Sequence, residues 1–181
     1  YTTTSQATVQ ALKHFGFIMP IYEADIPTNI YKDRTYSTAI AAKENYPKAD
    51  VVIFEKSEKL LAKVKISGGG RCNVTNGCTS ITELSKAYPR GGKALKKAFR
   101  IFNNKHAMQW FEDRGVPLII QDDNCVFPVS QNSQSIIDCL MGQVQEVGIE
   151  IRMRTPVQRI TQQDDSILVN DEAFDAVIVA T

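Results

Sequence analysis

The sequence is poor in the features that mark membrane and nucleic-acid-binding proteins. No apolar stretch approaches the roughly 18 uncharged residues of a membrane span, and the first residues show no basic start followed by an apolar signal core. Lys and Arg number 21 against 20 Asp and Glu, for a formal net charge of +1, so the overall charge indicates neither nucleic acid nor an anionic membrane as a partner. We therefore expect a cytoplasmic protein with small-molecule partners, and the composition leaves its oligomeric state open.

Cysteine and histidine are sparse and badly spaced for metal chemistry. The four cysteines (Cys72, Cys78, Cys125 and Cys139) form no CxxC pair, so neither a disulfide framework nor a zinc ribbon is indicated. Cys72 and Cys78 lack the second pair of ligands that a structural zinc site requires, and no metal is assigned. No second cysteine at CxxC spacing supports a redox role for Cys72, which is interpreted as a packing or ligand-loop residue.

The glycine turn of a dinucleotide-binding fold is also missing. The sequence predicts a helix over residues 36–45 and a buried strand over Val51–Glu55. In a βαβ unit, a first strand with a glycine turn should precede that helix. A G-x-G-x-x-G turn leading into the helix would put its glycines near Ile30, Lys32 and Thr35, and none of the three is glycine. Their side chains obstruct the positive φ angles and the close backbone approach that a pyrophosphate needs.

An acid does end the strand that follows. The run Val51–Phe54 is apolar and mostly β-branched, and Glu55 comes directly after it. In a dinucleotide-binding fold, a carboxylate in this position accepts hydrogen bonds from the hydroxyls of the adenosine ribose. The alternative is an acid that faces solvent or pairs with Lys56 or Lys59. The motif further along the chain favours the ribose.

That motif is a glycine triplet in the run Ser67-Gly68-Gly69-Gly70-Arg71-Cys72-Asn73-Val74-Thr75-Asn76. Its backbone N–H groups and the guanidinium of Arg71 can receive an anionic or electron-rich ligand. A simple tight turn is the alternative, but Arg71 and Asn73 beside the triplet favour a ligand-binding loop. Lys63 and Lys65 fit a phosphate contact and a solvated basic stripe equally well.

The rest of the chain alternates helical and strand patterns, which predicts an α/β fold with a β-meander near the C-terminus. An amphipathic helix is predicted for residues 133–146, ended by Gly148, and a hairpin for residues 116–120 and 125–129. Further elements are expected as helices over 9–17, 94–102 and 104–114, a strand over 149–153 and short strands over 157–160, 167–169 and 176–180. The last strand is apolar enough to be buried on both faces of a parallel sheet.

Residues 39–181 resemble the N-terminal part of a bacterial flavoprotein family, the NAD(P)/FAD-dependent oxidoreductases with BaiN-like and aminoacetone-oxidase-like members. The resemblance is carried by Ile53-Phe54-Glu55-Lys56, by the run from Lys63 to Asn76, by Phe127-Pro128-Val129-Ser130 and by Val177-Ile178-Val179-Ala180-Thr181. It implies a Rossmann-like FAD-binding fold of the glutathione-reductase type, incomplete because the first strand and glycine turn are not recognisable. Residues 1–38 are then a segment foreign to the family, and residues 39–181 a partial FAD/NAD(P)-binding domain, truncated on its C-terminal side.

The resemblance also implies a set of cofactor contacts. Glu55, with Lys56 beside it, would hold the adenosine ribose, and Val157 would meet the adenine through its backbone. Ala180 and Thr181 would lead toward the pyrophosphate. The flavin and ribityl side would lie along the loop Ser67, Gly68, Gly69, Gly70, Arg71, Cys72 and Asn73, and Lys63 is a further candidate for a cofactor contact. No catalytic acid or base is assigned, because the isoalloxazine ring would carry the hydride chemistry.

The sequence therefore predicts the N-terminal FAD-binding portion of a flavin-dependent oxidoreductase, with FAD as cofactor and NAD(P)H as reductant. The alternatives are a non-catalytic nucleotide-binding or interaction module, which kept the sheet without the cofactor turn, and a non-functional fragment. Because the first strand and the glycine turn are missing, we expect tight FAD binding by this chain alone to be impaired. The substrate and the choice between NADH and NADPH are left open.

Overall fold

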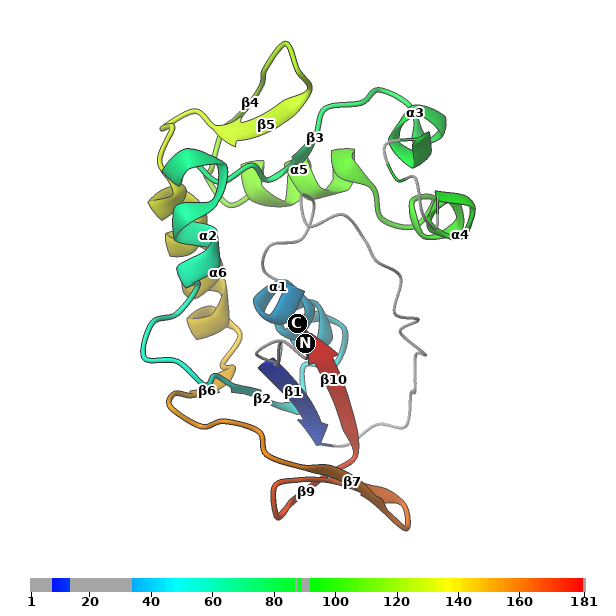
Figure 1. Cartoon of the computed structure of the whole chain (residues 1–181), viewed down its shortest axis with the longest axis vertical. Helices are drawn as coiled ribbons and strands as arrows, with labels where there is room; N and C mark the ends of the chain where they lie inside the picture. The colour runs from blue at the N-terminus through cyan, green and yellow to red at the C-terminus, as the bar shows by residue number, and fades with distance from the viewer. Residues whose placement is uncertain (1–7, 14–33, 87, 89–91, 181) are drawn as a thin grey trace, which may run out of the picture. The chain divides into compact units, whose positions relative to one another are not determined.

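The computed structural model describes residues 8–13, 34–86, 88 and 92–180. They form a mixed α/β fold that divides into two compact units, and each unit is described by itself (Figure 1). The first unit contains the described residues of 8–13, 34–60 and 140–180, and the second those of 61–139. The boundary at Leu140 falls inside helix α6 (Ser133–Glu146). That helix has the bounds predicted from its amphipathic pattern, and Gly148 with φ 72° follows it.

The first unit is built on a four-stranded sheet in the order β10-β1-β2-β6. Its strands are β1 (Thr8–Lys13), β2 (Asp50–Phe54), β6 (Glu150–Arg152) and β10 (Ala176–Ala180). Strands β2 and β6 are parallel, whereas β1 runs antiparallel to both β2 and β10. The helix expected over residues 9–17 is therefore wrong for residues 9–13, and residues 14–17 lie outside the described residues. The unpaired N–H and C=O groups of β2 and β10 favour an extended segment between them, which overrides a weak local helix pattern.

Helix α1 (Arg34–Asn45) precedes β2 and packs on it. Tyr36, Ala39 and Ile40 of this helix are buried, as are the four residues Val51–Phe54 of the strand. The ammonium of Lys43 donates to the backbone oxygen of Ala49 at 2.6 Å and closes the connection between helix and strand. The predicted helix and the predicted buried strand are both confirmed here.

A three-stranded antiparallel meander completes the first unit, with the strands β7 (Ile160–Gln163), β8 (Ser166–Val169) and β9 (Glu172–Phe174). A meander was predicted here, but its first strand begins at Ile160 rather than at Val157. The third strand is β9, which was not predicted, and the predicted third strand over 176–180 is β10 of the four-stranded sheet. The prediction that β10 is buried on both faces is wrong, because Val179 is 46% exposed. Among the described strands β10 pairs with β1 alone, and the strand at the end of a sheet has less cover than a central one.

The second unit carries a small sheet in the order β3-β5-β4 and several short helices. Its strands are β3 (Thr75–Asn76), β4 (Leu118–Ile120) and β5 (Cys125–Pro128), and its helices are α2 (Ala62–Ile66), a 3₁₀ turn (Ser67–Gly70), α3 (Ile81–Lys86), α4 (Gly92–Ala98) and α5 (Asn104–Glu112). Strands β4 and β5 form the predicted hairpin, and Asn124 takes the positive φ of 62° in its turn. Helix α4 ends at Ala98, four residues before the predicted end at Phe102.

One buried amide joins helix α5 to the chain that leaves the glycine loop. The side-chain nitrogen of Asn104, a residue that is 7% exposed, donates to the backbone oxygens of Asn76 at 2.6 Å and Cys78 at 2.7 Å. Its neighbour Asn103 is the N-cap of α5 and accepts hydrogen bonds from the backbone of that helix. The two adjacent asparagines therefore have different structural roles.

Asn104→Ala is expected to lower the free energy of unfolding by about 2–3 kcal/mol, because it leaves two carbonyl groups without their donor. Asn103→Ala should cost about 1 kcal/mol, the usual value for the loss of an N-cap. Urea denaturation of the two variants in parallel measures the difference. Equal losses of stability would contradict the role given to Asn104.

Two classes of structure are absent from the described part of the chain. No helix there is both long enough and apolar enough to cross a membrane. The described His, Cys, Asp and Glu side chains also form no group of three that could hold a metal ion.

Candidate functional site

Glu55 follows β2 directly, at the carboxyl edge of the sheet in the first unit. Its Oε1 atom accepts a hydrogen bond from the backbone N–H of Ser57 at 2.8 Å. The Ser57 hydroxyl also lies 2.8 Å from Oε1 and shares its single proton between that atom and the backbone oxygen of Lys59, at 2.8 Å. Both bonds end on Oε1, so Oε2 can accept a hydrogen bond from a ligand hydroxyl. Of the nearby acids it is Glu58, not Glu55, that pairs with Arg154, at 3.2 Å. The carboxylate is thus held in place at the end of the strand.

The backbone around Glu55 is joined to the segment that follows β6. Its N–H donates to the oxygen of Arg152 at 3.0 Å, and its oxygen accepts from the N–H of Thr155 at 2.9 Å. Val157, two residues further on, packs against the apolar cluster that contains Phe54. The fold therefore brings together Glu55 and Val157, the two residues expected at the adenosine end of the cofactor.

Arg152, the last residue of β6, contacts Phe54 and two carboxylates. Its guanidinium lies 5.3 Å from the centroid of the Phe54 ring and pairs with Glu150 at 2.8 Å and with Glu172. Hydrogen bonds to Glu150 and then to Glu172 raise the pKa of Arg152 above its usual value. The arginine is thereby tied to carboxylates of β6 and β9 and is engaged within the unit.

Ala180 lies at the same edge of the sheet as Glu55. Thr8 pairs with Ala180, and the next residue of β1, Val9, pairs with Phe54. The ends of β2 and β10 therefore face the same direction, as the expected contacts of Glu55 and Ala180 with one ligand require. Thr181 lies outside the described residues.

The glycine loop belongs to the second unit and is closed by its own backbone. Ser67 is buried and donates from its hydroxyl to the oxygen of Val64 at 2.9 Å, while the N–H of Cys72 donates to the Ser67 oxygen at 2.9 Å. Gly68, Gly69 and Gly70 have φ angles of 56°, 67° and 85°, and Cys72 has 63°. The left-handed glycines thus form a tight turn that residues with a Cβ rarely adopt, and the N–H of Arg71 also donates within it, to the Gly68 oxygen at 3.4 Å.

Gly68 has a second reason to be glycine. A Cβ atom at this position would lie 2.9 Å from the backbone nitrogen of Asn73 and 2.9 Å from Cε1 of Phe127. At Gly69, by contrast, nothing lies within 4 Å of such an atom. The first glycine therefore permits close packing of the loop, and the second only a turn.

Arg71 is stacked within the second unit. Its guanidinium carbon lies 4.0 Å from the centroid of the Phe127 ring, Nε donates to the oxygen of Gly68 at 3.2 Å, and Nη1 donates to Oε1 of Gln131 at 3.4 Å. The arginine is half-buried, and neither of these bonds uses Nη2. It can thus support the loop and still offer N–H groups to a ligand.

The loop is also fastened to its neighbours by residues on either side. Oδ1 of Asn73 accepts from the N–H of Val126 in β5 at 3.2 Å, and the N–H of Val74 donates to the Val126 oxygen at 2.7 Å. Before the loop, the hydroxyl of Ser133 donates to the oxygen of Lys65 at 2.9 Å. Asn73 and Ser133 therefore hold the loop between β5 and the beginning of α6.

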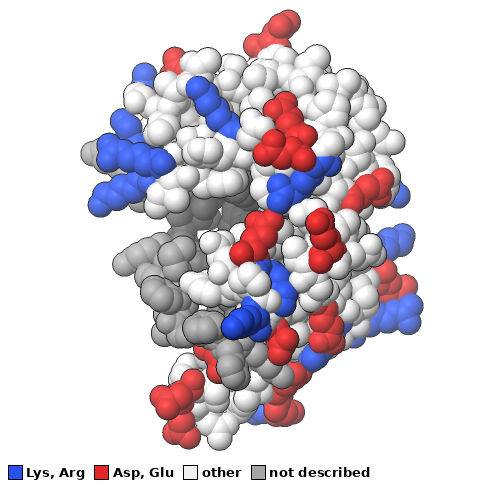
Figure 2. All heavy atoms as spheres, turned by 180° about the vertical axis from the view of Figure 1, so that it is seen from behind, with Lys and Arg blue, Asp and Glu red and all other residues white. Residues whose placement is uncertain are grey.

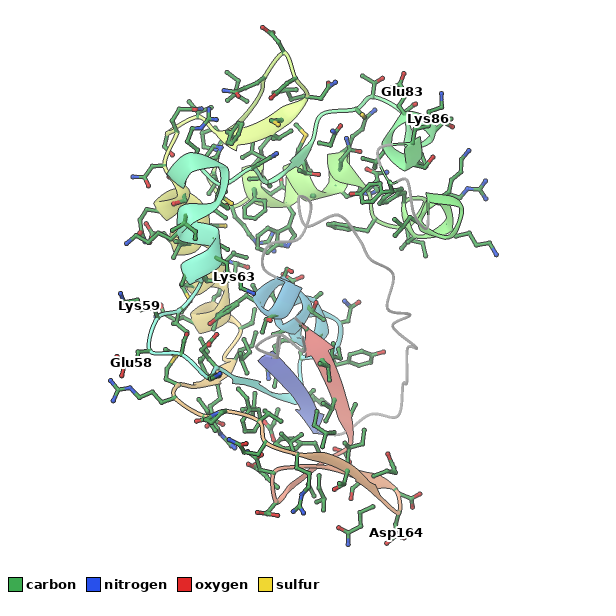
Figure 3. All side chains as sticks on the ribbon, viewed as in Figure 1. Glu58, Lys59, Lys63, Glu83, Lys86 and Asp164 are labelled. Atoms are coloured by element: carbon green, nitrogen blue, oxygen red, sulfur yellow. The ribbon has the colours of Figure 1, made fainter. Side chains whose placement is uncertain are left out.

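Lys56, Lys63 and Lys65 are exposed. Figure 3 shows Glu58 and Lys59 on the loop after β2, with their side chains directed away from the ribbon. Figure 2 shows Lys and Arg side chains near Asp and Glu side chains over much of one face. Exposed ion pairs such as Arg159 with Asp171, at 2.8 Å, contribute little to stability.

Two of the thiols are held in the protonated form. Burial, followed by the hydrogen bond and charge of Asp123, raises the pKa of Cys125. Burial likewise raises the pKa of Cys139, with a small opposing effect of the Arg114 charge. The N–H of Cys125 donates to Oδ1 of Asp123 at 2.9 Å, and this bond lowers the pKa of Asp123. A thiolate nucleophile is therefore disfavoured at Cys125 and Cys139 near neutral pH.

Sequence reasoning missed the residues that hold these two sets in place. Ser57 stands two residues after an acid, a spacing that hydroxyl side chains commonly use for local hydrogen bonds, and could have been found. Gln131 and Ser133 contact the loop region from 60 and 68 positions away and carry no local signal. Phe127 was singled out only through the family resemblance, and its contact with Arg71 was not predicted.

Comparison with known families adds one finding. A family model described as the HI0933-like protein Rossmann domain matches residues 37–181. The match begins within α1 and includes Glu55, the glycine loop, Val157 and Ala180.

Proposed function

The chain belongs to the HI0933-like family of bacterial FAD-dependent oxidoreductase-like flavoproteins, and on that basis we propose that it is the FAD-binding portion of a flavin-dependent oxidoreductase. The matched region is a Rossmann domain, the fold that binds dinucleotides at the carboxyl ends of its strands. The proposal names FAD as the cofactor and NAD(P)H as the reductant.

The arrangement of Glu55 is the observation that supports the proposal most strongly. Its carboxylate stands at the carboxyl end of β2, and Ser57 orients it through two hydrogen bonds to the same oxygen. An acid fixed in this way can accept hydrogen bonds from ribose hydroxyls without first losing side-chain freedom. Val157 and the end of β10 lie in the same unit, so one ligand can meet all three.

The glycine loop, considered by itself within the second unit, is a second candidate for binding an anionic or electron-rich group. Arg71, stacked on Phe127 beside the left-handed glycines, supplies a cation there. When bound, FAD would supply the hydride chemistry, and the protein would bind and orient it. The proposal also includes Ser67, Lys63 and Lys56 as contacts of the cofactor.

A non-catalytic nucleotide-binding module is the second candidate. The observation that favours it is the direction of β1, which runs antiparallel to β2 in the place of a Rossmann first strand. Such a module would keep adenosine recognition by Glu55 without redox turnover. NAD(P)H oxidation measured in the presence of FAD separates the two candidates.

Glu55→Gln tests the proposal directly. The glutamine oxygen can still accept the two bonds from Ser57, whereas its NH₂ group cannot accept from a ribose hydroxyl. We expect FAD affinity to fall about 10- to 100-fold, the range for losing a hydrogen bond to a charged group. Equilibrium dialysis with FAD, followed by absorbance, measures the change.

Glu58→Gln is the matched control, because Glu58 is exposed and pairs with Arg154. Its FAD affinity should stay within about twofold of the unaltered chain. Equal affinities of the Glu55 and Glu58 variants would refute the ribose role, and with it the main support for the proposed function.

A further inference from the structure

Strand β1 runs in the opposite direction to the first strand of a Rossmann fold, whose carboxyl end carries the pyrophosphate turn. In a Rossmann fold the first strand is parallel to its neighbours, and the turn at its carboxyl end approaches the pyrophosphate. Here Lys13, the last residue of β1, pairs with Asp50, the first residue of β2. The chain therefore leaves β1 at the edge of the sheet opposite to Glu55.

The sequence after β1 gives the same result independently. Residues 14–33 connect β1 to α1 and contain a single glycine, Gly16. A pyrophosphate-binding turn requires several glycines, for its positive φ angles and for close backbone approach. The Rossmann family match starts at residue 37, after this whole segment.

One element of the usual phosphate site is retained. Helix α1 contacts β2 and is joined to it through residues 46–49, so the two elements run in opposite directions. The N-terminal end of α1 therefore lies toward the carboxyl edge of β2. A helix dipole at an exposed end strengthens the binding of an anion only about two- to fivefold, far less than a complete turn of N–H groups provides.

We propose that the first unit recognises the adenosine part of adenine nucleotides, through Glu55 and the Val157 segment, and that the pyrophosphate adds less than about fivefold to the affinity. This inference rests on the proposed function and specifies which part of the cofactor the chain can hold. Adenosine, AMP and ADP then bind with similar dissociation constants. A complete Rossmann site would instead favour the diphosphate strongly.

The test is a titration of the ¹⁵N-labelled full chain with adenosine, AMP, ADP and ADP-ribose at one ionic strength, followed by NMR chemical shifts. Because a single subsite binds weakly, the ligands are added up to millimolar concentrations. Glu55→Gln and Glu58→Gln are titrated in parallel. We expect the four dissociation constants to agree within about fivefold, and all four to rise in the Glu55 variant only.

The outcomes separate this inference from the proposed function. If ADP bound at least about 50-fold more tightly than adenosine, with both dependent on Glu55, the pyrophosphate inference would be overturned and the proposed function would stand. If none of the ligands bound, or if Glu55→Gln had no effect on any of them, both would be overturned.

A disulfide experiment tests the strand direction itself. In the register of β1 and β2, Lys13 is opposite Asp50, within the distance that a disulfide can bridge. Thr8, at the other end of β1, is about 17 Å away along the strand. Lys13→Cys with Asp50→Cys should therefore form a disulfide under mild oxidation, and Thr8→Cys with Asp50→Cys should not. Peptide mass mapping identifies the bridge, and the reverse result would show a parallel strand and overturn the inference.

Discussion

Phe174→Ala is expected to lower the free energy of unfolding by about 3–5 kcal/mol, the usual cost of emptying a buried aromatic site. Phe174 is 1% exposed and meets the ring of Phe54 edge to face, with centroids 5.8 Å apart and an interplanar angle of 87°. Val52 and Val169 complete the buried cluster. The cavity would open between the meander and β2. Neither β9 nor β2 can shift to fill it without losing its strand pairing.

Ile160→Ala is the control for this prediction. Ile160 belongs to the same meander but is 40% exposed, so its truncation should cost about 0.5 kcal/mol. Urea unfolding followed by circular dichroism gives both values. A loss below about 1.5 kcal/mol for Phe174→Ala would show that the site collapses and that the meander does not brace β2.

The same variant has a functional readout. The chain passes from Phe54 directly to Glu55, and the packing of Phe174 restricts the position of that strand end. At a temperature where Phe174→Ala remains folded, we expect weaker adenosine binding than in the unaltered chain. Unchanged binding would show that the bonds between Ser57 and Glu55 suffice to position the carboxylate.

Gly68→Ala is the second large effect. A methyl group at this position would lie 2.9 Å from the backbone nitrogen of Asn73 and 2.9 Å from the Phe127 ring, on a residue with φ 56°. The left-handed backbone costs about 1–2 kcal/mol for a residue with a Cβ, and overpacking adds typically 1–3 kcal/mol. We expect a total destabilisation of about 3 kcal/mol.

Gly69→Ala separates these two causes. Gly69 has a similar φ of 67°, but nothing lies within 4 Å of an added Cβ, so this variant should show only the backbone cost of about 1–2 kcal/mol. Gly68→Ala should also displace Phe127 and weaken the stacking of Arg71, which is 4.0 Å from the ring. Denaturant unfolding and FAD affinity are measured for both variants. Equal effects would contradict the close packing assigned to Gly68.

Local patterns predicted the elements whose causes are local. The apolar face of α6 gave its bounds, and the turn before Cys125 gave the hairpin of β4 and β5. The strand β2 was found because four consecutive buried residues leave a continuous apolar run. In each case the residues that determine the element lie within it.

The missed features depend on distant partners. Strand β1 forms because β2 and β10 supply its hydrogen bonds, which its own sequence does not indicate. Arg71 was expected to offer its guanidinium to a ligand, and its stacking on Phe127 could not be inferred from either segment alone. The sequence likewise did not indicate that the residues expected to contact the cofactor belong to two units.

The pairing of Thr8 with Ala180 also sets an order of events during synthesis. Strand β1 is made early but cannot complete its hydrogen bonds until β10 has been made. The described residues of the second unit all lie between 61 and 139, so their contacts are closer in sequence and can form in the meantime. The partner of β2 on its other side, β6, is also made late, so both outer edges of the β1 and β2 pair stay unpaired until β6 and then β10 have been made. The nascent chain is therefore most exposed to aggregation in this interval.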